Sequence, residues 1–219
     1  MVHWGWVAAG RDPAARDDVR RAGAAVELLH AFAILHDDVM DRSELRRGHT
    51  AAHARARDAH RGAGSRGDAA HFGNSIAVLA GDLVHAEACH LVADLPAAAR
   101  EAWRTMMVEL VMGQRLDLTG AAQGRQDLDH ACTVAHLKTG SYTVEHPLRI
   151  GALLAGATPA ALACLETYGT HVGVAFGLRD DVLGLWGDPA RTGKPAGDDL
   201  VAGKATVLLA LAADRLPPA

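Results

Sequence analysis

Aromatic residues, cysteines and long apolar runs are all scarce in this sequence of 219 residues. Aromatic side chains make up only 4% of it, although β-sandwiches and barrels depend on such residues together with β-branched ones. Alanine is abundant instead, and alanine has the highest helix propensity. The composition therefore favours an all-α protein whose helices pack through small side chains.

The three cysteines, Cys89, Cys132 and Cys164, are odd in number and show no C-x-x-C spacing. This pattern argues against a disulfide framework and against a thiolate zinc site. The first residues, 1–6, lack the basic leader and the continuous apolar segment of a secretory signal. We therefore expect a cytoplasmic protein.

No run approaches the roughly 20 consecutive apolar residues that cross a bilayer, so we expect no membrane span. Charge of one sign is not in large excess either, because 22 basic residues stand against 26 acidic ones for a net charge of −4. A chain with this balance is a poor binder of nucleic-acid backbones, and we expect no nucleic-acid partner. Its length suits a single domain over residues 1–219.

Helical periodicity and turn residues divide the chain into a series of predicted helices. Asp12 and Pro13 form a helix start, because a capping carboxylate is followed by proline in the first turn. That helix continues to about residue 41, and the polar, glycine-containing residues 43–68 are predicted to form a loop with a short helix near 50–60. Further helices, of lengths that suit a bundle, are expected over 72–94, 97–118, 128–154, 159–183 and 204–215.

The most specific pattern is an aspartate-rich segment, His36-Asp37-Asp38-Val39-Met40-Asp41, at the end of the first long helix. On a helix Asp37 and Asp41 lie one turn apart on the same face, and Asp38 lies about 100° round from Asp37. Carboxylates crowded in this way repel one another unless a cation joins them, and hard oxygen ligands suit magnesium. A solvated acidic helix end is the alternative interpretation.

A second acidic pair, Asp180-Asp181, also ends an apolar helix, with Asp188 and Asp198-Asp199 downstream. Two such sites can face each other across a bundle cavity and hold metal ions between them. Cations that could bind a diphosphate bridged by those ions, or could simply be surface charges, are Arg46, Arg47, Lys138, Lys194 and Lys204.

With these residues the chain resembles the trans-isoprenyl diphosphate synthases, or polyprenyl synthetases. In that family a D-D-x-x-D motif and an R-R-G-x motif pair with a second D-D motif that precedes G-K-P-x-G-D-D-L-x-x-G-K. The corresponding segments here are 37–41, 46–49, 180–181, 193–200 and 203–204. Similarly placed runs at 81–83, 113–118 and 138–140 extend the resemblance over nearly the whole chain.

The resemblance implies an isoprenoid-synthase-type bundle around a central cavity, and a magnesium-dependent condensation of an allylic diphosphate with isopentenyl diphosphate. Magnesium would be ligated by Asp37, Asp41 and Asp180, with Asp38 and Asp181 in supporting positions. Groups that would stabilise the departing diphosphate are Arg46, Lys138 and Lys194. The remaining substrate-binding residues would be His30 and Arg47 for isopentenyl diphosphate, Thr139 beside the cation, and Lys204.

Product length in this family is set by the floor of the cavity. Phe32 lies five residues before Asp37, on nearly the same helical face and more than a turn deeper. A bulky ring at this position resembles the short-chain synthases that make geranylgeranyl diphosphate, and ordinary core packing is the alternative. Alanine-rich bundles of this type also resemble homodimers, so we expect a dimer.

The sequence departs from the family pattern at four places. Gly184 replaces the last carboxylate of the second motif, and Gly177 stands where the family usually has a glutamine. The basic G-G-K-R-x-R-P segment that normally precedes Trp4 is absent, and relatives continue with further helices after Arg215. The chain is thus expected to be an incomplete domain. The open alternatives are a terpene cyclase-like or other single-substrate diphosphate-ionising enzyme, and an impaired partner subunit.

Overall fold

The computed structural model describes residues 1–188, 193, 196–201 and 203–215, and most of them are helical. In this part of the chain the strand pairing is limited to one hairpin of two residues a side. The prediction of an all-α protein is therefore confirmed. Internal contacts divide the chain into two compact units, one formed by Met1–Gly23, Asp94–Gly187 and Ala196–Ala219, the other by Ala24–Ala93 and Asp188–Pro195. The single domain over residues 1–219 stays a prediction.

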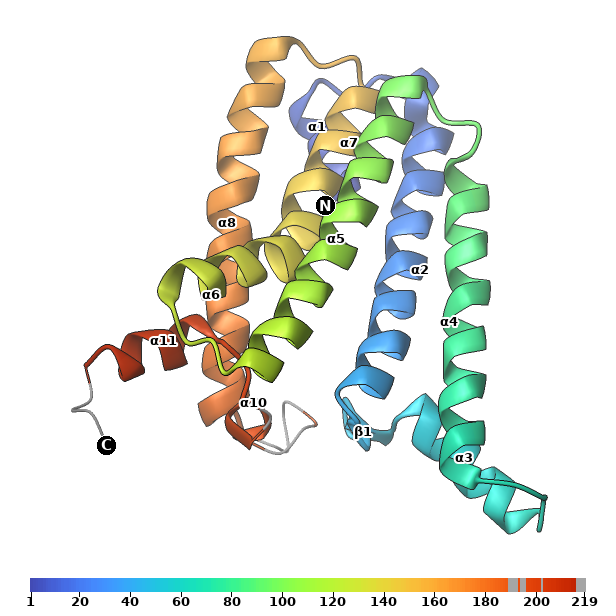
Figure 1. The fold of residues 1–219 in the computed structure, drawn as a ribbon. Helices are drawn as coiled ribbons and strands as arrows, with labels where there is room; N and C mark the ends of the chain where they lie inside the picture. Colours follow the sequence, from blue (N-terminus) through green and yellow to red (C-terminus); the bar gives the residue numbers. More distant parts are fainter. Residues whose placement is uncertain (189–192, 194–195, 202, 216–219) are drawn as a thin grey trace. The chain divides into compact units, whose positions relative to one another are not determined.

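The second unit holds the aspartate-rich segment at the end of its first helix. Its elements are the later part of α2 (Arg16–Met40), β1 (Leu45–Arg46), β2 (His49–Thr50), α3 (Ala52–Gly62) and α4 (Ala69–Val92), all labelled or coloured in Figure 1. Helix α4 begins at Asp68, whose carboxylate accepts hydrogen bonds from the backbone N–H groups of Ala70 (2.7 Å) and His71 (2.9 Å). These bonds satisfy donors that a helix start leaves open.

Helices α2 and α4 approach each other closely where His36 meets Gly81. A Cβ atom at Gly81 would lie only 2.3 Å from the imidazole Nε2 of His36. The same Nε2 lies 3.1 Å from the carbonyl oxygen of Val78, one turn earlier on α4. The position of α4 against the end of α2 therefore depends on glycine at residue 81.

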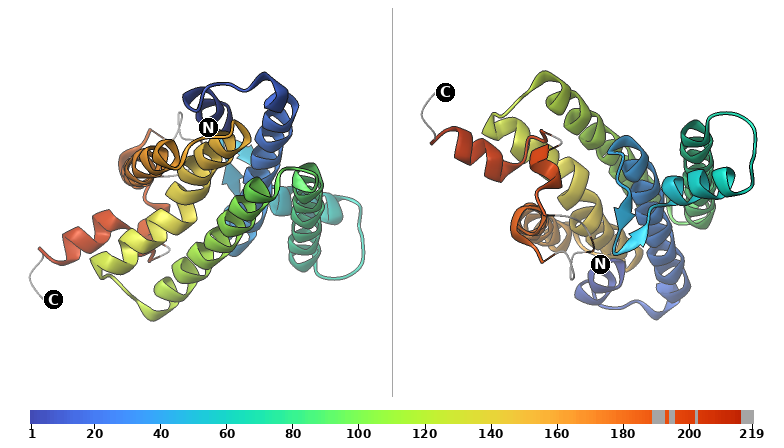
Figure 2. Two further views of the ribbon diagram at one scale, coloured as in Figure 1. Left: turned by 90° about the horizontal axis from the view of Figure 1, so that it is seen from above. Right: turned by 90° about the horizontal axis from the view of Figure 1, so that it is seen from below.

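The first unit is a helical bundle. Its elements are α1 (Val2–Ala8), η1 (Pro13–Ala15), the start of α2, α5 (Ala97–Gln123), α6 (Leu128–Val134), η2 (Ala135–Glu145), α7 (His146–Leu154), α8 (Pro159–Trp186), α10 (Asp198–Val201) and α11 (Val207–Ala213). Segments α6, η2 and α7 follow one another without a break and pack between α5 and α8, as Figures 1 and 2 show. This continuous helical segment contains Lys138 and Thr139, which the sequence predicts to bind substrate.

Polar caps explain why several of these helices begin and end where they do. The Asp12 carboxylate accepts a hydrogen bond from Ala14 N (3.0 Å) ahead of Pro13, which confirms the predicted start. Thr158 caps α8 in the same way, with proline in the first turn. Helix α5 ends at Gly124, whose φ of 64° is the left-handed conformation that glycine adopts easily.

The predicted helix over 128–154 is helical along its whole length, but its middle is not a regular α-helix. Residues Ala135–Glu145 form a π-helix of 11 residues. Such segments are rare and usually short, and they occur often at functional sites. The sequence showed helical periodicity here but no sign of the wider turn.

Helix α4 is long and apolar enough to cross a membrane by length and composition, with 22% of its apolar window buried. No long apolar run marks this helix in the sequence, because Asn74, Ser75 and Asp82 interrupt its apolar residues. Core helices of soluble proteins also meet this criterion. Several apolar side chains of α4 are nevertheless exposed in this structure.

Candidate functional site

The aspartate-rich segment lies where α2 ends, and its acids occupy different surroundings. The backbone N–H of Asp41 donates to the carbonyl of Asp37 (2.8 Å), so the helical turn continues through the motif. Asp37 and Asp41 are therefore one turn apart on one face, as predicted. Asp38 is only 3% exposed and lies under the following hairpin.

Arg46, from β1, holds the buried carboxylate. Its Nε lies 2.8 Å from Asp38 Oδ1, and its Nη2 contacts the same oxygen. That Nη2 also lies 3.3 Å from Asp37 Oδ2. Burial lowers the pKa of the Arg46 guanidinium, but the hydrogen bonds and charges of the two aspartates outweigh it and raise that pKa above its usual value. The guanidinium thus supplies the paired cation that a buried carboxylate requires.

Arg46 ends the first strand of the hairpin, and Arg47 is the first residue of its tight turn. Residues 46 and 49 pair across the two strands, and Arg47 and Gly48 have positive φ angles of 52° and 77°. Two positive values at the central positions are typical of a type I′ turn, which suits a two-residue connection. The sequence predicts a loop here, because two-residue strands are too short to show alternation.

Arg47 contacts His30, the other residue predicted to bind isopentenyl diphosphate. Arg47 Nη2 lies 3.3 Å from His30 Nε2. Burial lowers the pKa of His30, and the positive charges of Arg47 and Arg46 lower it further, against the opposing charge of Glu27. A neutral imidazole can accept the hydrogen bond from Arg47. The structure thus brings together two residues that the sequence grouped only by resemblance.

The hairpin also contacts the glycine of the G-K-P segment. Gly48 N donates to the carbonyl of Gly193 (3.1 Å), and Gly193 has a φ of 69°. A Cβ atom on Gly193 would lie 2.2 Å from Gly48 N, so no larger residue fits there. Two motifs far apart in the sequence therefore meet in one unit. Lys194 lies outside the described residues.

The second acidic pair lies near the end of α8, in the first unit. Asp180 is exposed and Asp181 is half-buried. Gly184, which replaces a carboxylate of the family pattern, accepts a hydrogen bond from Gly197 N (2.8 Å) through its carbonyl. The facing arrangement of the two acidic motifs stays a prediction.

Lys138 and Thr139 are presented by the π-helix η2. Lys138 Nζ lies 2.5 Å from Asp117 Oδ2, and Asp117 is only 6% exposed on α5. Gly177 faces the same segment, because a Cβ atom there would lie 3.9 Å from Thr139 Cβ. Asp117 belongs to the family-like run 113–118, but nothing in the sequence indicates its pairing with Lys138.

Two further predicted residues are Phe32 on α2 and Lys204 near the end of the chain. The ring of Phe32 packs against α4, with its centroid 4.8 Å from that of His85 and 4.6 Å from that of His36. This packing is the alternative that the sequence left open, and the role in product length stays a prediction. Lys204 is half-buried just before α11.

The donor set at the end of α2 suits magnesium. Among the described residues no three His, Cys, Asp or Glu side chains form a complete metal cage. Magnesium is commonly held by one or two carboxylates together with substrate phosphates and water, and Asp37 and Asp41 supply two hard oxygen ligands one turn apart. These residues therefore fit the predicted ion.

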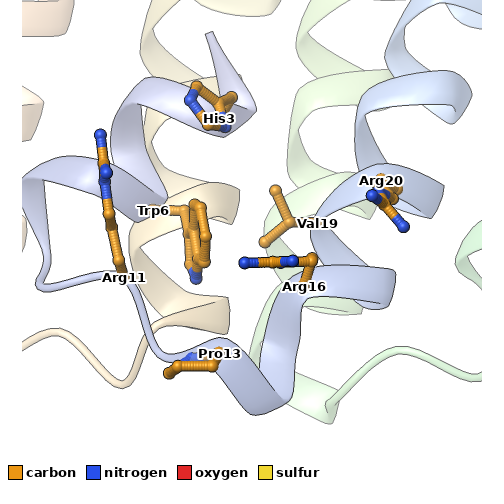
Figure 3. Close-up of a pocket in the computed structure, with 7 residues that line it drawn as sticks. All are labelled: His3, Trp6, Arg11, Pro13, Arg16, Val19 and Arg20. Atoms are coloured by element: carbon orange, nitrogen blue, oxygen red, sulfur yellow. The ribbon is translucent and has the colours of Figure 1, made fainter.

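A separate basic pocket of about 580 Å³ lies where α1 meets the start of α2 (Figure 3). Figure 3 shows the guanidinium of Arg16 directed toward Trp6, whose indole Nε1 donates to Asp12 O (2.9 Å). Arg20 is paired with Asp17 at 3.3 Å. The pocket contains none of the predicted site residues; its lining consists of His3, Trp6, Arg11, Pro13, Arg16, Val19 and Arg20.

Comparison with known proteins gives one consistent family. The family model described as polyprenyl synthetase matches residues 3–219. The chain is 34% identical over 201 residues to a geranylfarnesyl diphosphate synthase from Aeropyrum pernix, and 36% identical over 195 residues to a geranylgeranyl diphosphate synthase from Mycobacterium tuberculosis. These alignments cover 88% and 87% of this chain.

Solved structures agree. A geranylgeranyl pyrophosphate synthase from Corynebacterium glutamicum, complexed with isoprenyl diphosphate and magnesium, matches 98% of this chain with a TM-score of 0.93 and 42% identity. A polyprenyl synthase from Caulobacter crescentus, complexed with calcium and isoprenyl diphosphate, has a TM-score of 0.80 and 32% identity over 98% of this chain. The chain spans only 58% and 51% of the two curated relatives, and 62% and 60% of the two solved chains.

Proposed function

Because the chain belongs to the polyprenyl synthetase family, we propose that it is the core of a magnesium-dependent, short-chain prenyltransferase. The reaction condenses an allylic diphosphate with isopentenyl diphosphate and releases inorganic diphosphate. The product is geranylgeranyl diphosphate or a chain of similar length. Relatives named as synthases of such products support this substrate class.

The acidic end of α2 is the observation that carries the proposal. Arg46 donates hydrogen bonds to the buried carboxylate of Asp38 and to Asp37. These contacts place a fixed positive charge within the acidic cluster. Asp37 and Asp41 share a helical face at this point. An arrangement of this kind suits the binding of a magnesium diphosphate, because the acids hold the ion and the cation attracts the phosphate oxygens.

Asp37, Asp41 and Asp180 would hold magnesium, and the ion would supply Lewis-acid polarisation of the diphosphate. Lys138 stabilises negative charge on the departing diphosphate, and Lys194 adds a second cation. His30 and Arg47 bind the diphosphate of isopentenyl diphosphate. Thr139, beside Gly177 on the neighbouring helix, helps to exclude water from the allylic cation.

We further propose that the protein is a cytoplasmic homodimer, in which a second copy covers the apolar side of α4. Phe72, Ile76, Leu79 and Leu83 are exposed and are spaced three or four residues apart, so they form one stripe along the helix. Leu79 and Leu83 are 63% and 65% exposed. Burial in a dimer explains this stripe without a membrane.

Product analysis tests the proposed function. The chain is incubated with magnesium and farnesyl diphosphate, with and without isopentenyl diphosphate. We expect a longer prenyl diphosphate only when both substrates are present. Hydrocarbon formed without isopentenyl diphosphate would support the cyclase alternative, and no turnover in either mixture would support an impaired subunit.

Asp37→Asn tests the metal site within the same assay. Removing one hard, charged ligand should lower kcat/KM by at least about a hundredfold, a loss of roughly 2.7 kcal/mol of transition-state stabilisation. Asp17→Asn, an exposed change at the opposite end of the same helix, is the matched control and should keep wild-type activity. Equal activity of the two variants would refute the assignment of Asp37.

A further inference from the structure

We propose that Glu109 is a positioning residue, which acts through Ser141 and His146 to hold the π-helix that presents Lys138 and Thr139. The inference rests on the proposed function, because it assigns Glu109 to the placement of two of its substrate-binding residues. Glu109 lies outside all the sequence motifs of the candidate site.

One carboxylate oxygen of Glu109 joins two consecutive elements. Its Oε2 accepts hydrogen bonds from Ser141 Oγ (2.5 Å) and from His146 Nε2 (2.8 Å). Ser141 is fully buried in η2, three residues after Lys138, and His146 is the buried first residue of α7. The carboxylate therefore fixes the later part of the π-helix to the start of the next α-helix.

Glu109 is one of three residues on a single face of α5 that contact η2. Glu109, Gly113 and Asp117 follow at intervals of four residues, so they lie in a row along the helix. A Cβ atom at Gly113 would lie 2.4 Å from Lys138 N, and Asp117 binds the Lys138 ammonium directly. Along this row, Gly113 makes a close backbone contact with η2, and the carboxylates of Glu109 and Asp117 bind η2 one turn to either side.

Contacts with α8 hold the opposite side of η2. Gly140 and Gly173 touch so closely that a Cβ atom on either would lie within 3 Å of the other's backbone. The Thr170 hydroxyl donates to Glu145 Oε2 (3.1 Å) near the end of η2. The wide turn is therefore held from both sides, with Glu109 as the anchor on the α5 side.

The charge of Glu109 suits this role. Burial raises the pKa of Glu109, but the hydrogen bonds from Ser141 and His146, with the charges of His146 and His136, outweigh it and hold that pKa below its usual value. An ionised carboxylate accepts two hydrogen bonds on one oxygen, and bonds to a charged acceptor are stronger than neutral ones.

Loss of this anchor should move Lys138. The hydrogen-bonded loop of a π-helix (i→i+5) spans one residue more than that of an α-helix (i→i+4), and one residue corresponds to about 100° of rotation in an α-helix. If η2 returned to the α-helical form, Lys138 and Thr139 would rotate relative to the contacts with Asp117 and Gly177. The diphosphate would then lose a correctly placed cation, while the aspartate-rich segment stayed intact.

The experiment compares Glu109→Ala with Glu109→Gln and with Glu101→Ala. Glu101 lies two turns earlier on α5, is exposed and pairs only with Arg104 among the described contacts, so its variant is the matched control. Hydrogen exchange of residues 135–145 is measured without substrate, and KM and kcat are measured for the allylic diphosphate. We expect Glu109→Ala to lose amide protection in 135–145 and to raise KM about tenfold, equivalent to one lost charged contact.

Glu109→Gln keeps an acceptor for Ser141 and should give an intermediate KM, and Glu101→Ala should match the wild type. A purely structural role would lower the folded fraction and kcat together without changing KM. Wild-type exchange and wild-type KM in Glu109→Ala would overturn the inference.

Absence of product with the wild type would overturn the proposed function instead. In that case the role of Glu109 is tested by calorimetry, which measures the affinity of each variant for magnesium diphosphate. Weaker binding by Glu109→Ala than by Glu101→Ala would support it, and equal binding would refute it.

Discussion

At the scale of single residues, the site depends on how a few charges are paired. Asp38 and Asp117 are both nearly buried, and each holds one of the cations that the sequence identified. Buried carboxylates are costly unless a cation and hydrogen bonds compensate them. Arg46 and Lys138 therefore stabilise these buried acids, and in the proposed reaction they also interact with the diphosphate.

Two glycines on α8 give a residue-scale prediction with an internal control. Gly177→Ala should stabilise the fold by roughly 0.5–1 kcal/mol, because its Cβ would meet neighbours only at ordinary distances, 3.5 Å or more, and alanine favours helix. Gly173→Ala, one turn away, should destabilise by roughly 1–3 kcal/mol, because its Cβ would lie 2.9 Å from Gly140 Cα. Urea denaturation of both variants measures the difference, and equal midpoints would contradict the packing described for η2.

The lowered pKa of Glu109 gives a prediction on pH. In the folded state the carboxylate is stabilised, so its contribution is present above the usual pKa of 4.5 and is lost as pH falls through the lower folded value. The melting temperature of Glu109→Gln should therefore lie below that of the wild type at pH 6, and the gap should close below about pH 4.5. Glu87→Gln, a change at an exposed residue of α4, is the control and should have a melting temperature close to that of the wild type.

At the scale of elements, much could be predicted and two features could not. Caps such as Asp12 and Thr158 act on neighbouring backbone groups, so helix starts are visible in a short stretch of sequence. The hairpin at 45–50 and the π-helix at 135–145 were missed. Two-residue strands show no periodicity, and the wide turn is held by α5 and α8, which are distant in the sequence.

The hairpin gives an element-scale prediction, because its attachment to α2 depends on Arg46. Arg46→Ala should cost up to about 3 kcal/mol of stability, because it leaves the buried Asp38 without its cation. Adding Asp38→Asn should recover part of that loss, since it removes the unpaired charge. Arg104→Ala, which breaks an exposed pair with Glu101, should cost no more than about 1 kcal/mol. Thermal or urea denaturation measures all three, and a mild effect of Arg46→Ala would count against the anchoring role.

At the scale of the whole molecule, the proposed dimer gives the clearest test. Leu79→Glu together with Leu83→Glu places charges in the exposed stripe of α4 and should convert the dimer into a monomer. Light scattering should give twice the chain mass of 22.9 kDa for the wild type and one chain mass for the double variant. Tyr168→Glu changes an exposed apolar residue on α8 and should remain a dimer. A monomeric wild type at micromolar concentration would contradict the proposal.

The sequence by itself determined the helical class, most helix positions and the family, because periodicity, caps and linear motifs are properties of neighbouring residues. It also identified the acids and cations of the candidate site. Only the tertiary structure decided which of them pair, bringing Arg46 to Asp38, Arg47 to His30 and Lys138 to Asp117. These partners lie between 8 and 21 residues apart. Folded packing, which sequence spacing does not encode directly, brings them into contact.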